Sequence, residues 1–456
     1  MISEKDRFYA TSGDITPDGP SVWHILDWDQ RRNISVKMSQ ELDDEEPAIE
    51  QLKKHIDEID PDIFLIHVSP SGRLISSSKD PKYDQAMSVY YPPIKEVTPV
   101  EGRNPIRRSE LIEIDRLGPG TDLVLHASTG AKLEFKYYWD RAWMFRIWDE
   151  MNLWRRLPWH PQIAVFENIV VDEGGSKVIG FTTESTHGAS LKDQKRPTFK
   201  LKWLKQLINV VDDLNLKYGI QHQNISTETI IVDSEKDSIK LTNFNVAVHV
   251  GSEDLFGARD DILGVSSTVY EYITRRGDYD QRGFKNIKAK NWVQHPEVIL
   301  DAPGPQFHAL IKEWQDRRAS GPQILSYKAA PEHIEWPVMT EPEPISRSYI
   351  MQDGSTRSKS IVTYCERRID ALANGREVLN WERPPQSKLA KGERVLATGK
   401  RVEQRESSAT NGTHEEEKKE APAMCPMGMM KMQSGGYSMD DMDELLKLCP
   451  FSGRKA

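Results

Sequence analysis

The stretch that decides the fold is YGIQHQNISTETIIV, residues 218–232, which is followed by IKLTNFN, residues 239–245. Apolar residues recur at helical spacing over residues 204–214, so a helix packed on a core precedes the stretch. The stretch itself begins with a polar loop led by His222 and ends in an apolar run typical of a short strand. A turn at residues 233–236 separates this run from a second strand. Helix, polar loop and two strands in this order place a row of polar side chains beside an apolar core.

Upstream of this stretch, two glycines mark a turn between predicted strands. They are Gly118 and Gly120 in LGPGT, with SELIEIDR before the turn and DLVLHA after it. Glycines at such a turn allow backbone N–H groups to approach a phosphate closely. Taken alone, the pattern is also that of an ordinary turn.

The next strand and the helix after it each carry one charged residue of interest. In LEFK, residues 133–136, the alternation places Lys136 on the face opposite Phe135, where its ammonium group can hold a phosphate. The following helix has Glu150 beside an apolar stripe. An inward carboxylate on that helix can pair with Lys136 and fix its amine. The stripe consists of Met144, Ile147, Trp148 and Met151.

Taken together and in this order, these segments resemble the protein kinase superfamily. Their amino-acid sequences are similar to those of a group of fungal kinase-like proteins. The similar stretches are LWRRLPWHPQIAVFENIVVDEGGSKVIGFTT, RDDILGVSSTVYEYIT, WVQHPEVILD and NWERPPQ. The resemblance covers about residues 107–320 and a strap to about residue 386. It implies an α+β fold of two lobes, with a β-rich N-lobe at about residues 109–190 and an α-rich C-lobe at about residues 191–320.

The resemblance also implies roles for the residues named above. Gly118 and Gly120 correspond to the phosphate-binding loop, and Lys136 with Glu150 to the ion pair that holds the α- and β-phosphates of ATP. The loop led by His222 corresponds to the catalytic loop.

The departures from the kinase pattern decide the expected function. Asn224 stands where the catalytic aspartate is expected, Thr229 at the position of the metal-binding asparagine, and Asn243 at that of the metal-binding aspartate. An amide cannot take a proton as a general base, a role worth roughly 10²–10⁴-fold in rate. Mg²⁺ prefers carboxylate and phosphate oxygens, so the site is expected to bind it weakly or not at all. We therefore expect a pseudokinase with no intact catalytic residue and no metal site of its own.

Smaller departures point the same way. Leu123 replaces the third glycine of the phosphate loop, Gln223 the arginine after the loop histidine, and Asn245 the glycine of the metal-binding triplet. The segment after the triplet is short and lacks an APE-like anchor, so the platform for a peptide substrate is expected to be truncated. Asp260 or Asp261 resembles the helix aspartate that braces the catalytic loop.

Three functions remain open at this point. The first is a pseudokinase that acts by binding protein partners, with Lys136 and Glu150 leaving ATP binding open. The second is an active Ser/Thr kinase that uses a surrogate acid, such as Glu228 or Asp260. The third is a purely structural scaffold, in which Leu123 or a bulky neighbour fills the space of the phosphates.

The regions on either side carry no catalytic constellation. Residues 1–108 read as a small α+β module, with a helix over residues 41–60 and a strand, turn and strand over residues 62–76. Residues 321–402 are expected to form a C-terminal strap, in which residues 359–374 form a helix stopped by an Asn-Gly pair.

Residues 403–456 are polar, charged and Met-rich, and are expected to be disordered. The methionines around Cys425 suit Cu(I), and the Cys-Pro steps at Cys425 and Cys449 resemble haem-responsive motifs, but neither pattern has the spacing of a strong metal site. Residues 439–448 fit a short helix that docks in the groove of a partner, or a solvated acidic tail.

Composition and net charge limit the classes of partner and the compartments that the sequence allows. The 456 residues carry a formal net charge of −9, which argues against nucleic acid as a partner. No apolar run approaches the roughly 20 residues of a membrane helix, and the first residues lack the apolar core of a secretory signal. Three cysteines are too few for a disulfide framework. The sequence therefore predicts residence in the cytoplasm or the nucleus, with protein partners and no membrane partner.

Overall fold

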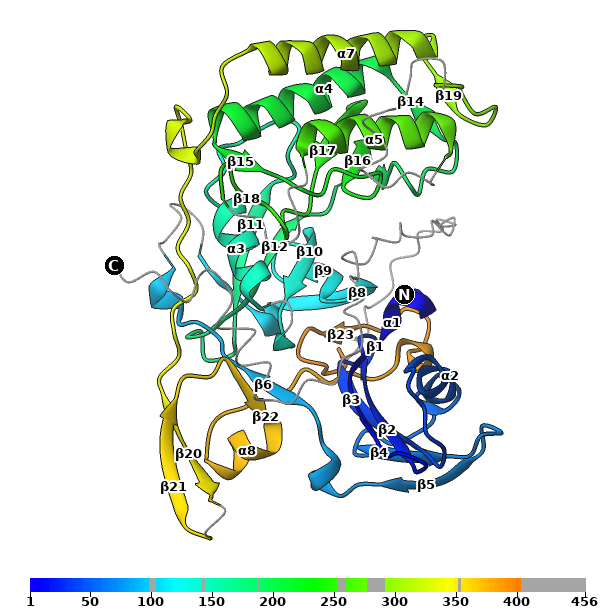
Figure 1. The fold of residues 1–456 in the computed structure, drawn as a ribbon, viewed down its shortest axis with the longest axis vertical. Helices are drawn as coiled ribbons and strands as arrows, with labels where there is room; N and C mark the ends of the chain where they lie inside the picture. Colours follow the sequence, from blue (N-terminus) through cyan, green and yellow to red (C-terminus); the bar gives the residue numbers. More distant parts are fainter. Residues whose placement is uncertain are drawn as a thin grey trace, which may run out of the picture.

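The computed structural model describes residues 1–97, 104–141, 144–186, 188–252, 260–276, 292–351 and 354–402. Within them the fold is mixed α+β, as the sequence predicts. Figure 1 shows a small sheet and its helices built from the N-terminal residues, a larger central sheet, and a group of helices at the opposite end. The tail beyond residue 402, with its predicted disorder and its metal and haem motifs, lies outside the described residues.

The N-terminal residues form a five-stranded sheet in the order β1-β2-β3-β4-β5. β3 and β4 are parallel, because helix α2 connects them as a crossover, and the other neighbours are antiparallel. α2 packs Ala48, Ile49 and Leu52 on a core that the sheet completes. The helix predicted over residues 41–60 forms over residues 46–55, and the two strands predicted after it are confirmed. The bounds are α1 Glu4–Arg7, β1 Phe8–Ile15, β2 Ser21–Asp27, β3 Arg32–Met38, α2 Glu46–His55, β4 Leu65–Val68 and β5 Leu74–Ser78.

The central sheet has seven strands in the order β23-β8-β9-β10-β12-β11-β7. Strands β8 to β12 follow one another along the chain, whereas β23 is contributed by the C-terminal strap and closes one edge. Helix α3 connects β10 to β11 and carries the predicted apolar stripe, which is buried. The bounds are β7 Ile106–Arg107, β8 Leu111–Gly118, β9 Thr121–His126, β10 Lys132–Tyr137, α3 Met144–Trp154, β11 Phe166–Val171, β12 Val178–Glu184 and β23 Val395–Leu396.

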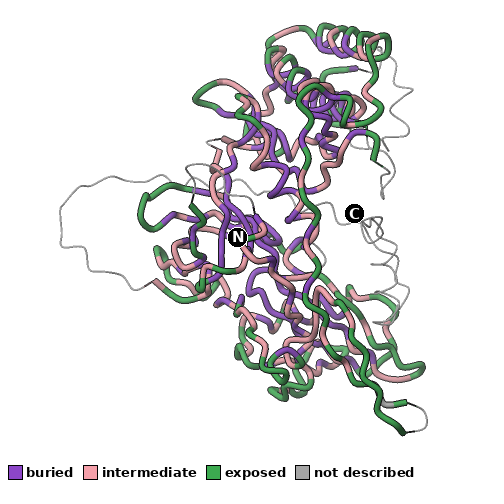
Figure 2. Tube along the Cα trace, turned by 90° about the vertical axis from the view of Figure 1, so that its left-hand side faces the viewer, coloured by how far each residue is buried: buried purple, intermediate pink, exposed green. Residues whose placement is uncertain are grey.

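The helices α4, α5 and α7 lie together at the far end of the molecule from the N-terminal sheet (Figure 1). Short strands connect them to the central sheet, and one continuous apolar core runs from α3 into α4 and α5. In Figure 2 the buried residues follow the same path through the middle of the molecule. The bounds are β13 Gly188–Ser190, β14 Thr198–Phe199, α4 Leu201–Asp212, β15 Ile220–Gln221, β16 Ile230–Asp233, β17 Ser238–Leu241, β18 Val248–His249, α5 Asp261–Thr274, β19 Ile299–Leu300 and α7 Gly304–Ser320.

The strap differs from its prediction. The helix expected over residues 359–374 exists only as α8, Arg368–Ala373, and it is followed by the predicted Asn-Gly stop. The prediction of helix over residues 359–367 is wrong, because β21, Thr356–Ile361, pairs with β20, Ile345–Ile350. Strand β22, Cys365–Arg367, pairs with β6, Met87–Val89. Pairing with the neighbouring strand β20 and with the distant strand β6 overrides a short helical spacing of apolar residues.

The two faces of the central sheet pack against different parts of the chain. Phe135 and Tyr137 of β10 face an apolar cluster that includes Trp28 of the N-terminal module and Trp381 of the strap. The rings of Tyr137 and Trp381 stack with centroids 5.1 Å apart. The opposite face carries Lys136 and faces α3. The N-terminal module and the strap therefore cover the outer face and leave the lysine face toward the helical end.

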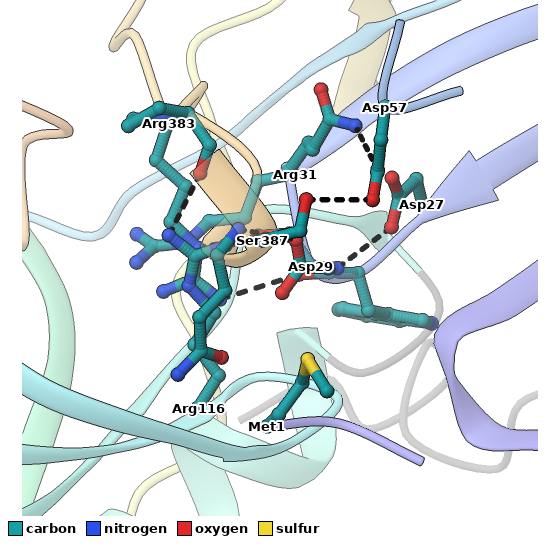
Figure 3. Close-up of polar contacts among 12 residues, drawn as sticks. Met1, Asp27, Asp29, Arg31, Asp57, Arg116, Arg383 and Ser387 are labelled. Carbon is teal, nitrogen blue, oxygen red and sulfur yellow. Dashed lines mark hydrogen bonds and ion pairs between the residues drawn. The ribbon is translucent and has the colours of Figure 1, made fainter. Parts of the chain in front are cut away.

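A buried cluster of charges joins the N-terminal module, the central sheet and the strap. Arg383 of the strap donates to Glu113 Oε2 and to Asp122 Oδ2, each at 2.8 Å. Arg31, between β2 and β3, donates to the same Asp122 oxygen at 2.8 Å. Figure 3 shows the guanidinium groups from three distant parts of the chain gathered beside Asp29. The members are six buried side chains: Asp29, Arg31, Glu113, Arg116, Asp122 and Arg383.

Among the described residues, no helix combines the length and the apolar character needed to cross a bilayer.

Candidate functional site

The candidate site is centred on Lys136, on the face of β10 that points away from the N-terminal module. Its Nζ donates to Glu150 Oε1 at 2.7 Å and to Asn243 Oδ1 at 3.1 Å. The ring of Trp154 lies 5.6 Å from the same nitrogen. Only 10% of the Lys136 side chain and 1% of the Glu150 side chain are exposed. The structure thus forms the ion pair that the sequence predicts and adds Asn243 to it.

The ion pair is buried and only partly satisfied. Among the described residues, Glu150 Oε2 has no hydrogen-bond partner. Removing two charges from water is costly unless the geometry is good and the remaining lone pairs are bonded. Lys136 therefore supplies the partner of a carboxylate that is buried away from water, and this structural role exists with or without a ligand.

Asn243 reaches Lys136 because of its backbone conformation. It follows β17 and has a φ of +63°, in the left-handed region that asparagine tolerates better than most residues. Phe244 is buried beside it, with its ring centroid 5.1 Å from that of Trp154 and 4.8 Å from that of His222. The aromatic contacts hold the segment, so that the carboxamide oxygen of Asn243 points at the lysine.

The loop led by His222 is fixed from inside the protein. His222 Nε2 donates to the carbonyl oxygen of Thr242 at 3.0 Å, and His222 Nδ1 accepts from the backbone N–H of Asn224 at 3.2 Å. Burial lowers the pKa of His222 to about 4, so the ring is neutral at pH 7. The histidine is a brace between the loop and the strand that leads to Asn243.

Asp261, rather than Asp260, supports the same loop. Its carboxylate accepts from the backbone N–H groups of His222 at 2.8 Å and Gln223 at 2.7 Å, and from Asn215 Nδ2 at 2.8 Å. Asp260 instead caps helix α5 by accepting from the backbone N–H of residue 262 at 2.8 Å. Gln223 has a φ of +59°, and the two hydrogen bonds to Asp261 stabilise this turn.

Thr229 and Asn224 lie close together, but their contact is internal. The Thr229 hydroxyl donates to the carbonyl oxygen of Asn224 at 2.7 Å and accepts from the backbone N–H of Ser226 at 3.0 Å. Thr229 is 3% exposed. Its hydroxyl is used to close the loop, and it would have to leave these partners to reach a metal ion.

The two glycines end the strand pair next to Lys136. Gly118 pairs with Thr121 across a two-residue turn, and Thr121 in turn pairs with Lys136 on β10. The turn has proline followed by Gly120 at a φ of +67°, which is the pattern of a type II turn. The carbonyl oxygen of Gly120 accepts from the backbone N–H of Tyr137 at 3.0 Å. The structure therefore brings the glycines and the lysine to one end of the sheet, in a turn that is short and hydrogen-bonded to β10.

Sequence reasoning missed Glu134, which shares the lysine face of β10. It lies two residues before Lys136, opposite Leu123 on β9 and Thr183 on β12. It is half-buried, and burial raises the pKa of its carboxyl to about 7, with a further rise from Glu184 and an opposing effect of Lys136. The alternation that placed Lys136 on this face also places Glu134 there, so the signal was present in LEFK.

Glu184 and the two predicted surrogate acids are engaged in contacts of their own. Glu184, at the end of β12, binds Lys240 and also accepts from the backbone N–H of Val165 at 2.9 Å. Glu228, one of the two predicted surrogate acids, pairs with Lys192. The other, Asp260, is the helix cap described above. In the part of the chain that the structure describes, no group of three or more His, Cys, Asp and Glu residues could hold a metal ion.

No protein-family model matches the chain. A search of curated proteins finds no significant match either.

Proposed function

We propose that the protein is a pseudokinase of bilobal, protein-kinase-like architecture that acts by binding protein partners. The observation that carries the proposal is the contact between Lys136 and Asn243. At the position where a carboxylate is expected to hold a metal, the oxygen of a neutral amide accepts a hydrogen bond from the lysine that is expected to hold phosphates. Mg²⁺ prefers carboxylates, and Asn224 cannot serve as a base. The site therefore lacks both the carboxylate metal ligand and the general base on which phosphoryl transfer depends.

The arrangement around this contact supports the kinase-like part of the proposal. A lysine on a central strand pairs with a glutamate on the next helix, and both lie beside a loop led by a histidine. An aspartate at the start of α5 braces that loop by its backbone. These are the parts, in the order along the chain, on which the resemblance to protein kinases rests.

A scaffold that binds no nucleotide is the second candidate, and Glu134 favours it. Lys136 is shared between Glu150 and Asn243, and Lys240 is bound by Glu184. Glu134 then adds a carboxyl on the face where phosphates would lie. A carboxylate there repels phosphate and offsets the attraction of the lysine. The active-kinase alternative is weaker, because Glu228 and Asp260 are engaged elsewhere.

Thermal denaturation of the full chain with ATP, with and without Mg²⁺, separates these functions. A ligand at about 100 times its Kd stabilises a protein by roughly 2.7 kcal/mol, which raises the melting temperature measurably. Lys136→Met tests the site, and Lys132→Met, at an exposed position on the same strand, is the matched control. A rise with ATP alone that is lost only in Lys136→Met supports a nucleotide-binding pseudokinase, and no rise supports a scaffold.

A phosphoryl-transfer assay on the same proteins tests the central claim. We expect no transfer above that of Lys136→Met. Transfer by the wild type that needs Mg²⁺ and disappears in Lys136→Met, but persists in Lys132→Met, would refute the proposal and identify an active kinase.

A further inference from the structure

Strands β20 and β21 form a ribbon that projects from the strap at the end of the molecule opposite helices α4, α5 and α7 (Figure 1). They pair along their whole length, from Ile345 with Ile361 to Ile350 with Thr356. Figure 2 shows the ribbon as largely exposed, and its second strand is exposed from Thr356 to Ser360. A two-stranded ribbon without a covered apolar face is marginally stable in water.

The alternation of the strands gives the ribbon a hydroxyl face and a basic face. Ser346 pairs with Ser360, and Ser348 pairs with Ser358, on one face. The other face carries Arg347 directly opposite Lys359, and Arg357 is the next residue along the same face. Like charges directly opposite each other across two strands are destabilising.

No carboxylate of the described residues forms an ion pair with these three basic side chains. Other basic side chains of the strap form ion pairs with carboxylates: Arg368 pairs with Asp84, and Arg376 pairs with Glu366. The chain as a whole is acidic, with 70 acidic and 61 basic residues. An uncompensated basic face on an acidic protein indicates an anionic partner that the described residues do not supply.

We propose that the basic face of the ribbon binds the acidic segment 437–446 of the same chain. This segment reads YSMDDMDELL and carries four carboxylates and no basic residue. The other acidic run of the tail, EEEKKE, contains its own lysines. Four carboxylates against three basic side chains make the two surfaces complementary in charge, and the proposal does not depend on the pseudokinase function.

The length of the chain permits this contact. The described residues end at Val402, so residues 403–436 connect the strap to the acidic segment. A flexible chain of that length has a root-mean-square span of about 32 Å. Tethering of this kind gives an effective concentration in the millimolar range, so that a weak electrostatic contact is populated within one molecule.

Zero-length carbodiimide cross-linking of the full chain tests the contact. Lys359 is the only amine in residues 345–361, so its cross-links report on the ribbon. We expect Lys359 to couple to Asp440, Asp441, Asp443 or Glu444 within the monomer. The yield should fall several-fold at 1 M salt, where the Debye length is about 3 Å.

Two sets of variants make the test specific. The double variant Arg347→Glu/Arg357→Glu keeps Lys359 and should lose the cross-link several-fold. Lys391→Glu/Lys400→Glu makes the same change in net charge at exposed positions outside the ribbon and should retain it. Neutralising the tail by Asp440→Asn, Asp441→Asn, Asp443→Asn and Glu444→Gln leaves the ribbon untouched and should speed tryptic cleavage after Arg357 and Lys359.

The opposite outcomes overturn the proposal. Coupling of Lys359 only to acids outside residues 440–444, or equal cleavage of the ribbon with the native and the neutralised tail, would show that this segment is not its occupant. Cross-links found only between two molecules would assign the ribbon to contacts between copies of the chain.

Discussion

Lys136 Nζ lies 3.1 Å from Asn243 Oδ1 and 2.7 Å from Glu150 Oε1, so one buried ammonium group joins the central sheet, helix α3 and the segment after β17. A carboxylate at residue 243 would make the same contact as an ion pair and would also attract a cation. The amide of Asn243 keeps the hydrogen bond with Lys136 but carries no charge. This site is therefore built to hold its parts together, and the predictions below separate that role from ligand binding.

The first prediction concerns the charge at residue 243. Asn243→Asp supplies a carboxylate beside Lys136, and carboxylates are the ligands that Mg²⁺ prefers. If the site admits a nucleotide, we expect ATP to raise the melting temperature of this variant more with Mg²⁺ than without it. Asn209→Asp, on an exposed position of α4, makes the same change in charge and should behave as the wild type. Equal shifts with and without Mg²⁺ in Asn243→Asp would show that residue 243 does not control metal binding.

The second prediction concerns the buried ion pair. Lys136→Met leaves Glu150 buried without its partner, which we expect to cost about 3–5 kcal/mol in the free energy of unfolding. The double variant Lys136→Met/Glu150→Leu should recover most of this loss, because apolar side chains of similar size replace both charges. Lys132→Met should change stability by less than about 0.5 kcal/mol. Denaturant unfolding measures all three, and a double variant no more stable than the single one would contradict the prediction.

Much of this site could be predicted from local sequence. The alternation in LEFK gave the face of Lys136, and the spacing of the next helix placed Glu150 toward it. The same alternation places Glu134 on that face, although a glutamate in a sequence is normally expected to face solvent. The choice between Asp260 and Asp261 needed coordinates, since both begin the same helix and differ only in which backbone groups they reach.

The strap and the charged cluster could not be predicted in this way. Residues 356–361 form a strand by hairpin pairing with β20, and residues 365–367 form one by pairing with β6, which is distant in sequence. The helical spacing of the apolar residues in this stretch does not reveal either pairing. Arg31, Arg116 and Arg383 read as surface residues, since arginine is mostly exposed unless it is paired. Their burial depends on three segments meeting over one face of the central sheet.

The third prediction concerns pH and Glu134. The pKa of this carboxyl is raised to about 7 in the folded protein, first by burial, against about 4.5 when unfolded. The folded state therefore binds the proton more tightly, so the contribution of Glu134 to stability is complete below pH 4.5 and is lost as the pH rises through 7. Glu134→Gln replaces the carboxyl by a group that does not ionise, so the variant does not lose this stability as the pH rises. We expect the variant to match the wild type at pH 4 and to exceed it at pH 8 by on the order of 1–2 kcal/mol, less than the full shift because part of the side chain stays in water.

Denaturant unfolding across this pH range checks the third prediction. Glu4→Gln, at an exposed position, is the control and should show the same difference from the wild type at every pH. If the free energy of unfolding of Glu134→Gln differs from that of the wild type by the same amount from pH 4 to 8, this carboxyl titrates alike in the folded and unfolded chain.

The fourth prediction concerns the junction of the three segments. Arg383 donates to Glu113 and Asp122 and also to the carbonyl oxygen of Asp29 at 2.6 Å, so it connects the strap to the sheet and to the N-terminal module. Arg383→Met leaves two carboxylates with fewer partners, and we expect a loss of about 3–5 kcal/mol. Although burial alone would raise the pKa of Glu113, the arginines lower it, Arg383 most of all. The wild type should therefore lose stability as the pH falls below about 4.5, and Arg383→Met should show a weaker dependence.

The matched control for this junction is Arg394→Met, at a half-buried position of the same strap outside the cluster. It should cost no more than about 1 kcal/mol. Unfolding from pH 3 to pH 7 measures both variants. Because the cluster contributes polar contacts between the N-terminal module and the central sheet, Arg383→Met should also make the protein several-fold more sensitive to protease. A variant that unfolds like the wild type at every pH and resists protease equally would show that the apolar packing of Trp28 and Trp381 is sufficient to hold the module in place.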